Sequence, residues 1–134
     1  MALADYLDFA VLNHFFRGVP APAPAAVFVA LFNGHPDNEG AEISAEGYER
    51  IPMAFSEPAK DGLGRFVVNT EYREYPRARG DWGQVTHFVV FDGRVGGTAI
   101  FAARLKRERV VREDDKLYFE KGDLRIQYLI GTGE

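Results

Sequence analysis

The chain has 134 residues, 46% of them hydrophobic and 27% charged, with a formal net charge of −4 and no cysteine. This composition predicts one globular domain, residues 1–134, and excludes a disulfide framework, a thiolate nucleophile and a cysteine-based zinc site. The negative charge argues against nucleic acid as a partner, and the lack of an apolar run of about 18 residues argues against a membrane. Asp5 and Asp8 interrupt the apolar N-terminal stretch, which is unlike a signal peptide.

Residues 2–17 are predicted to form an amphipathic helix, because Leu3, Leu7, Val11 and Phe15 recur at helical spacing. A second apolar flank is formed by Phe9, Leu12 and Phe16. The helix is therefore apolar over more than half of its circumference. We expect it to be widely covered, by its own sheet or by a neighbouring subunit.

A proline-rich strap, residues 18–26, follows the helix, and Gly18 supplies the helix stop. Each proline fixes φ and biases the residue before it to an extended conformation, so the strap is expected to be a stiff polyproline II segment. Its prolines are Pro20, Pro22 and Pro24. We interpret the strap as a spacer, because it lacks the basic and aromatic flanks of a ligand for an SH3-like domain.

The remainder of the chain, residues 27–130, is predicted to be a β-domain, because β-branched and aromatic runs alternate with turn signals. The expected strands are 27–32, 48–55, 65–72, 85–91, 98–105, 109–112, 116–120 and 124–130. Glycine-rich turns at 92–97 and 121–123 predict hairpins around them. About eight short strands predict a mainly β fold, a single β-sandwich or jelly-roll-like domain with an N-terminal helix, and a barrel is the alternative.

No constellation of side chains indicates catalysis or metal binding. His14, His35 and His87 lie on separate predicted elements, and none has a second ligand-type residue at metal spacing. Ser44 and Ser56 do not lie in a nucleophile elbow. We therefore expect no enzyme activity, no cofactor and no metal.

The run from Arg104 to Arg112 is the one basic cluster of the sequence. Its arginines offer an acidic partner a complementary surface. The alternative is a solvated face whose charges pair with nearby acids such as Glu108 and Glu113. We favour this second interpretation, because surfaces of mixed sign are usual.

The composition has a further bias. Serine, glutamine and asparagine are scarce, whereas arginine and glutamate are abundant. This bias is typical of proteins from hot environments, although a GC-rich genome produces a similar one. Asn33-Gly34, a pair that deamidates readily, argues mildly against a hot environment.

Several motifs follow one another in a fixed order along nearly the whole chain. They are Asp5–Arg17 with its Leu-Asn-His and Phe-Arg elements, Val27–Phe32, Glu42 with Gly47–Arg50, Trp82–Phe101 and Val111–Ile126. In this order and spacing they resemble a family of small tailed-phage virion proteins, often labelled tail-fibre-like, some of which decorate capsids. The chain departs from that family where glutamate and arginine replace serine and threonine. This departure fits a thermophilic phage and favours the capsid-decorating members.

The resemblance implies a structural protein of the virion. We predict a capsid decoration, or auxiliary, protein that is made in the host cytoplasm, binds the major capsid protein on the outer surface of the head and stabilises it. A homotrimer would match the symmetry of such a lattice and gain avidity from three attachments. Candidate interface residues are Leu3, Leu7, Val11, Phe15, Pro20, Pro22, Pro24, Arg104, Arg107 and Arg109.

Two other functions stay open. The first is a tail or tail-fibre component, which is also structural but lies elsewhere on the virion. The second is a carbohydrate-binding β-module that uses Trp82, Tyr72 and Tyr75 as stacking platforms for sugar rings. Location on the head or the tail, together with affinity for glycans, would separate the three hypotheses.

Overall fold

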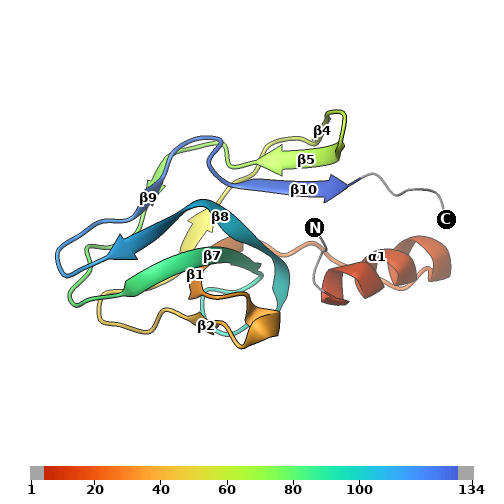
Figure 1. Cartoon of the computed structure of the whole chain (residues 1–134). Coiled ribbons are helices and arrows are strands. Elements are labelled where there is room, and N and C mark those ends of the chain that lie inside the picture. Colours follow the sequence, from red (N-terminus) through yellow and green to blue (C-terminus); the bar gives the residue numbers. More distant parts are fainter. Residues whose placement is uncertain (1–4, 130–134) are drawn as a thin grey trace.

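The computed structural model describes residues 5–129, which form one helix followed by ten strands in three sheets (Figure 1). The helix predicted for residues 2–17 is present over the described part as α1 (Asp5–Arg17). A short 3-10 helix, η1 (Pro36–Asn38), follows the first strand. The strands are β1 (Val27–Asn33), β2 (Ala41–Glu42), β3 (Ile51–Met53), β4 (Ala59–Lys60), β5 (Gly64–Val68), β6 (Arg73–Glu74), β7 (Gly83–Phe91), β8 (Ala99–Val111), β9 (Tyr118–Phe119) and β10 (Arg125–Leu129). The predicted mainly β fold with an N-terminal helix is confirmed over these residues.

The largest sheet has five antiparallel strands, in the order β2-β1-β7-β8, and β3 also pairs with β1. Strand β1 is buried on both faces: Val29 and Leu31 belong to the main core, and Ala30 belongs to a smaller cluster on the opposite face. A strand covered on both faces has a continuous apolar sequence, which explains why residues 27–32 show no alternation.

Strands β7 and β8 form the predicted hairpin. Gly96 and Gly97 in its turn have φ of 64° and 77°, a region that glycine adopts without strain. The Thr98 N–H donates to Asp92 Oδ1 at 2.7 Å across the turn. Strand β8 is longer than expected, because it continues to Val111 and absorbs the separate strand predicted at 109–112.

The pairing between β7 and β8 contains a large bulge. Val85 lies opposite Arg109, and His87 lies opposite Arg104, so residues 105–108 of β8 face Thr86 alone. Such a bulge leaves residues of the longer strand unpaired and increases the local twist. β8 is an edge strand of the sheet. The bulge shifts its following side chains away from the positions that a regular ladder would give them.

The other sheets are small: one has the order β10-β5-β4, and the other pairs β6 with β9. The closing hairpin predicted for 116–120 and 124–130 is wrong in its pairing. Its turn exists, with Gly122 at a φ of 87°, but β9 pairs with β6 and β10 pairs with β5. The buried Asn69 explains this difference, because it donates to the Glu120 carbonyl and accepts from the Leu124 N–H. These bonds occupy both ends of the turn.

Two other predicted strands are shorter than expected. The strand predicted at 48–55 is reduced to β3, because Tyr48 and Arg50 lie outside regular pairing and hydrogen-bond to Glu42. The strand predicted at 65–72 ends at Val68, where the chain turns at Asn69. Side-chain hydrogen bonds thus decide where both strands end.

The main core lies between the large sheet and the segments that carry the smaller sheets, which lie above it in Figure 1. Its largest fully buried members include Tyr75, Phe101, Phe119, Leu31 and Leu124. The Tyr75 hydroxyl donates to the Val29 carbonyl at 2.8 Å, so its polar atom is satisfied inside the core.

Helix α1 lies at one side of the β-structure and contacts β8 (Figure 1). It ends as predicted: Gly18 has a φ of 69°, and the Val19 N–H donates to the Asn13 carbonyl at 3.1 Å. The strap, residues 18–26, follows without regular secondary structure. Within residues 5–129, no helix has the length and apolar character that a membrane span requires.

Candidate functional site

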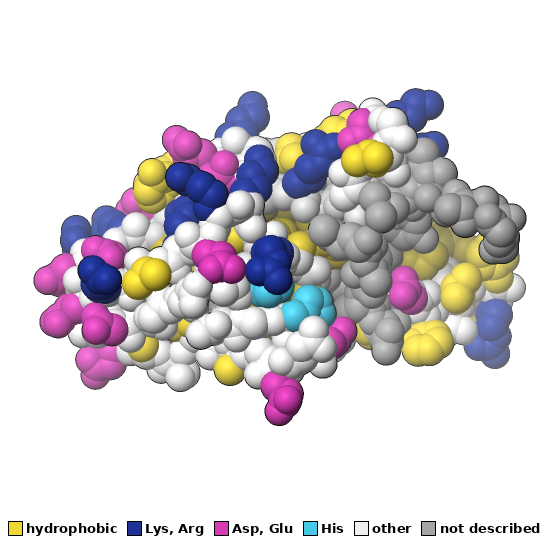
Figure 2. Space-filling model, viewed as in Figure 1, with side chains coloured by type: hydrophobic (Ala, Val, Ile, Leu, Met, Phe, Trp, Pro, Cys, Tyr) yellow, Lys and Arg dark blue, Asp and Glu magenta, His cyan; other side chains and the backbone are white. Residues whose placement is uncertain are grey.

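Helix α1 exposes large apolar side chains. Phe15 and Phe16 are 74% and 80% exposed, and Phe9 and Leu12 are 66% and 55% exposed. Figure 2 shows hydrophobic side chains at this end of the molecule. Single exposed apolar residues are ordinary, but a group of them on one short helix marks an interaction surface. We call these four side chains the apolar face of α1.

The other interface residues predicted on the helix lie differently. Leu7 is half-buried, as are Ala10 and Asn13, and this spacing places the three on one side of α1. Because α1 contacts β8, we infer that this side is turned toward the sheet. Val11 lies at its margin and is 39% exposed, and Leu3 is outside the described residues. The structure therefore divides the first predicted flank: Leu7 lies on the sheet-facing side, whereas Phe15 lies with the open second flank.

The strap is exposed along its whole length up to residue 26. Its three prolines, Pro20, Pro22 and Pro24, are all exposed, and the structure gives them no regular pairing. At the helix end, Arg17 donates to Asn13 Oδ1 at 2.8 Å. The strap is therefore an exposed segment that joins α1 to β1.

The arginines predicted as a basic interface lie on β8, and the structure separates them into two groups. Arg104 pairs with Glu108 at 3.3 Å, and Glu108 also accepts from Gln84 Nε2 at 2.6 Å. This exposed network agrees with the solvated face that the sequence analysis favoured. Arg107 and Arg109 instead line a cavity between β8 and β9.

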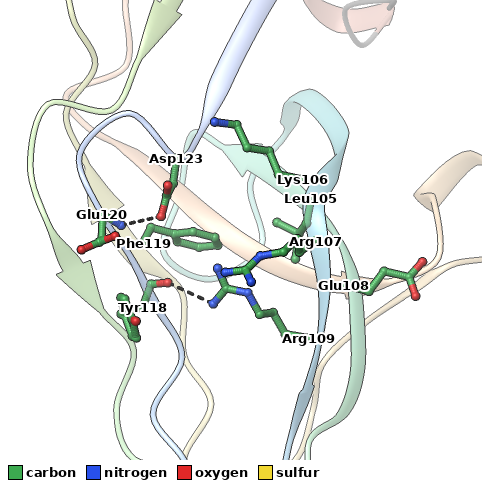
Figure 3. A pocket seen from close by; sticks show the side chains of 9 residues that line it. All are labelled: Leu105, Lys106, Arg107, Glu108, Arg109, Tyr118, Phe119, Glu120 and Asp123. Carbon is green, nitrogen blue, oxygen red and sulfur yellow. Dashed lines mark hydrogen bonds between the residues drawn. The ribbon is translucent and has the colours of Figure 1, made fainter.

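This cavity has a volume of about 270 Å³. Figure 3 shows its lining residues: Leu105, Lys106, Arg107, Glu108, Arg109, Tyr118, Phe119, Glu120 and Asp123. Arg107 and Arg109 extend from β8 toward β9 in this view. Arg109 Nη1 donates to the Tyr118 carbonyl at 3.4 Å, while its buried Nε atom has no hydrogen-bond partner. Among the side chains that the structure describes, those of residues 6–127, neither guanidinium forms an ion pair with a carboxylate.

A second polar cluster joins Glu42, Tyr48 and Arg50, which the sequence analysis identified as a family motif. Arg50 forms a two-point contact with Glu42, with Nε to Oε2 at 2.9 Å and Nη2 to Oε1 at 3.0 Å. Its Nη1 donates to the carbonyls of Gly93 and Gly96, at 2.9 and 2.6 Å. The motif therefore ties β2 to the turn between β7 and β8, and its role in this structure is to fix that turn.

The ionisation of this cluster follows from its contacts. Burial by itself would raise the pKa of Glu42, but the hydrogen bonds from Arg50 and Tyr48 outweigh it and lower that pKa. Burial and the hydrogen bond to Glu42 raise the pKa of Tyr48. The hydrogen bond to Glu42 likewise raises the pKa of Arg50. At neutral pH the cluster is therefore a paired carboxylate and guanidinium with a neutral tyrosine.

The aromatic platform predicted for sugar binding is wrong for two of its three members. Tyr75 and Trp82 are 1% and 5% exposed, and both belong to the main core. The Trp82 Nε1–H donates to the Glu46 carbonyl at 3.0 Å. Tyr72 is exposed and stacks on Tyr118 at 5.5 Å between ring centroids. Tyr75 and Trp82 therefore serve the packing of the core and do not offer a surface to a sugar ring.

The structure brings two of the three histidines together. The rings of His35 and His87 meet edge to face at 5.6 Å, and His14 lies on α1. Burial, with the nearby charge of Arg104, lowers the pKa of His87. Over the described part of the chain, no group of three or more His, Cys, Asp or Glu side chains is placed to hold a metal ion.

Sequence reasoning did not distinguish the two arginines of the cavity, Arg107 and Arg109, from Arg104. A signal was present in the alternation of β8, where Phe101, Leu105 and Val111 are buried. Arg107 and Arg109 share the odd-numbered positions of these residues, which in a regular strand lie on one side, and both extend toward β9 in Figure 3. A sequence pattern does not reveal the bulge opposite Thr86, which interrupts the alternation of β8, so the shared position of the two arginines at the cavity could not be predicted.

The comparison with known proteins agrees with the resemblance found in the sequence. Residues 2–127 match the family described as Podophage GP4 fiber I protein gp80. No curated protein matches the chain. The match includes α1, the strap and the strands from β1 to β9, so it covers both the apolar face and the cavity. The chain therefore belongs to this family of podophage fibre proteins.

Proposed function

We propose that this protein is a non-catalytic structural subunit of the phage virion, which joins its neighbours through the apolar face of α1 and the strap. The observation that carries the proposal is the exposure of four large apolar side chains on a helix of 13 residues. Full burial of one such side chain is worth about 1.5–3 kcal/mol. Assembly with a neighbour gains this free energy, which the described fold alone leaves unused.

We take the neighbour to be another copy of this chain, in a homotrimer. The strap supports this assignment, because residues 19–26 would span about 25 Å if they were extended as polyproline II, at about 3.1 Å per residue. With α1 held at the side of its own β8, its open flank and the exposed strap are both available to an adjacent copy. A closed symmetric ring covers the apolar face on every copy at once.

The place of the trimer on the virion has two candidates. The family is described as a fibre protein, and this description favours the tail, as part of a fibre. Capsid decoration, which the sequence analysis favoured, is the second candidate. It is supported by the short strands of residues 27–129, which form sheets but no repeated shaft of the kind that a long fibre uses.

Sedimentation equilibrium tests the assembly. The full chain should sediment as a trimer, and replacing Phe9, Phe15 and Phe16 together by serine should release monomers that keep the circular dichroism spectrum of the fold, because these side chains are exposed within one copy. The control is Leu63→Ser with Val95→Ser, which removes apolar residues that are equally exposed elsewhere. A trimer that persists in the helix variant, or a full chain that is monomeric at all concentrations, would refute assembly through the apolar face of α1.

Copy number tests the location. Quantitative mass spectrometry of purified virions should find only a few trimers if the protein belongs to a tail fibre, and on the order of hundreds of copies if it decorates the capsid lattice. Separated heads and tails provide the check. Recovery of the protein with tails supports the fibre assignment, and recovery with heads overturns it in favour of decoration.

A further inference from the structure

We propose that the cavity between β8 and β9 binds the carboxylate of an acidic, extended segment of a neighbouring virion protein. The groups that bind the carboxylate are the guanidinium groups of Arg107 and Arg109. This site lies on strands β8 and β9 and uses none of the side chains that form the apolar face of α1. It therefore adds a second, electrostatic attachment to the proposed function.

The first argument is the position of the two arginines. Arg107 and Arg109 lie on β8 between the buried residues Leu105 and Val111; Arg107 is exposed at the rim of the cavity, and Arg109 is half-buried. Burying part of a guanidinium group is costly unless its donors are paired. Arg109 shows the consequence, since its Nε atom is buried without a hydrogen-bond partner.

The second argument is that the acidic residues lining the cavity do not satisfy these charges. Glu108 is held by Arg104 and Gln84 on the other side of the strand. Asp123 accepts the Glu120 N–H at 2.8 Å, and the Glu120 carboxylate points away from the guanidinium groups in Figure 3. The cavity thus holds two forked donors with room for an acceptor between the strands.

The third argument identifies the acceptor chemistry. A guanidinium group presents parallel N–H donors that match the two oxygens of a carboxylate, and such pairs are shorter and stronger than neutral hydrogen bonds. The protein carries a net charge of −4, so this pair is a local exception rather than part of a generally basic surface. A general polyanion would require a broader basic field.

The backbone favours a peptide over a carboxylated sugar. Strand β8 is the edge of its sheet, and five consecutive residues of it, 105–109, line the cavity. Residues 105–108 lie in the bulge, opposite the single residue Thr86, so their backbone groups are free of the regular ladder. An extended peptide can pair with such an edge while its acidic side chain enters the cavity.

The experiment is an NMR titration of the full chain labelled with ¹⁵N, with the capped peptide acetyl-Val-Glu-Val-Glu-Val-amide as the probe. The Arg109 Nε–H signal should shift, and the glutamine analogue of the peptide should have little effect. Arg107→Gln should weaken binding about tenfold or more, the loss expected for a charged hydrogen bond. Arg65→Gln, an exposed residue on β5, removes the same charge elsewhere and should leave binding unchanged.

Several results would overturn the proposal. They are equal binding of the glutamine peptide, an equal loss in Arg65→Gln, or no shift with about 10 mM peptide, a concentration that detects even millimolar affinity. Stronger binding of D-glucuronate than of the peptide would assign the cavity to a sugar acid instead. Arg109→Lys, which keeps the positive charge but not the paired N–H donors of the guanidinium group, should also weaken binding of the peptide. Because oligomeric mass is measured separately, the result does not depend on the trimer.

Discussion

Replacing Arg50 with methionine should destabilise the fold far more than an ordinary surface substitution. The side chains of Arg50 and Glu42 are 9% and 26% exposed, and the guanidinium also bonds two turn carbonyls and lies 3.7 Å from the ring centroid of Phe91. Breaking a buried pair costs about 3–5 kcal/mol. Since Glu42 keeps some contact with water, we expect the lower end, about 3 kcal/mol, or a fall of about 10 °C in melting temperature.

Urea unfolding monitored by the fluorescence of Trp82, the only tryptophan, provides the assay. Arg73→Met is the matched control, because Arg73 pairs with Glu71 through side chains that are 43% and 48% exposed. Such an exposed pair is worth less than about 1 kcal/mol. If the two substitutions cost the same, the two-point contact does not fix the turn, and the structural role assigned to the motif is wrong.

Three further outcomes are expected. Because the pKa of Glu42 lies below its ordinary value of 4.5, the ionised group stabilises the fold above that value, and this stability is lost as pH falls through the lower folded pKa. Urea titrations of the wild type and of Glu42→Gln should therefore converge on acidification, and a constant gap would contradict this. Asn69→Ala should cost roughly 2–4 kcal/mol in urea unfolding, because it leaves the Leu124 N–H and the Glu120 carbonyl without partners; a cost below about 1 kcal/mol would refute that account. Tyr75→Phe removes only the donor to the Val29 carbonyl and should cost about 1–2 kcal/mol by thermal melting, whereas a neutral change would show that this bond adds no stability.

The sequence predicted those parts of the fold that depend on local patterns. The helix ends at Gly18 because a positive φ is needed there, and the turn before β8 forms because glycine supplies the same conformation. Strand β1 was visible as an apolar run, since burial on both faces removes alternation. These signals lie within a few residues of the features that they specify.

Pairing between distant segments was less predictable. Strands β9 and β10 separate because Asn69, far away in the chain, bonds both ends of the turn between them. Arg107 and Arg109 line the cavity beside a bulge opposite Thr86, where the regular alternation of β8 is interrupted. A local pattern does not record either contact, so the sequence suggested a hairpin and a solvated basic run instead.

The candidate surface was predicted in part. The sequence showed that the N-terminal helix is apolar on two flanks, but not which flank its own sheet covers. Docking of α1 at β8 leaves Leu7 half-buried and Phe9 and Phe16 open. The choice between the flanks is a tertiary contact, and helical periodicity alone does not specify it.

Photocrosslinking within intact virions tests the central claim most directly. A photoreactive amino acid in place of Phe16 reports what covers the apolar face of α1, and the same group in place of Val95, which is 88% exposed, is the control. We predict a strong crosslink from position 16 to a neighbouring copy of this chain and little from position 95. Equal labelling from both positions, or none from position 16 in assembled virions, would contradict the account.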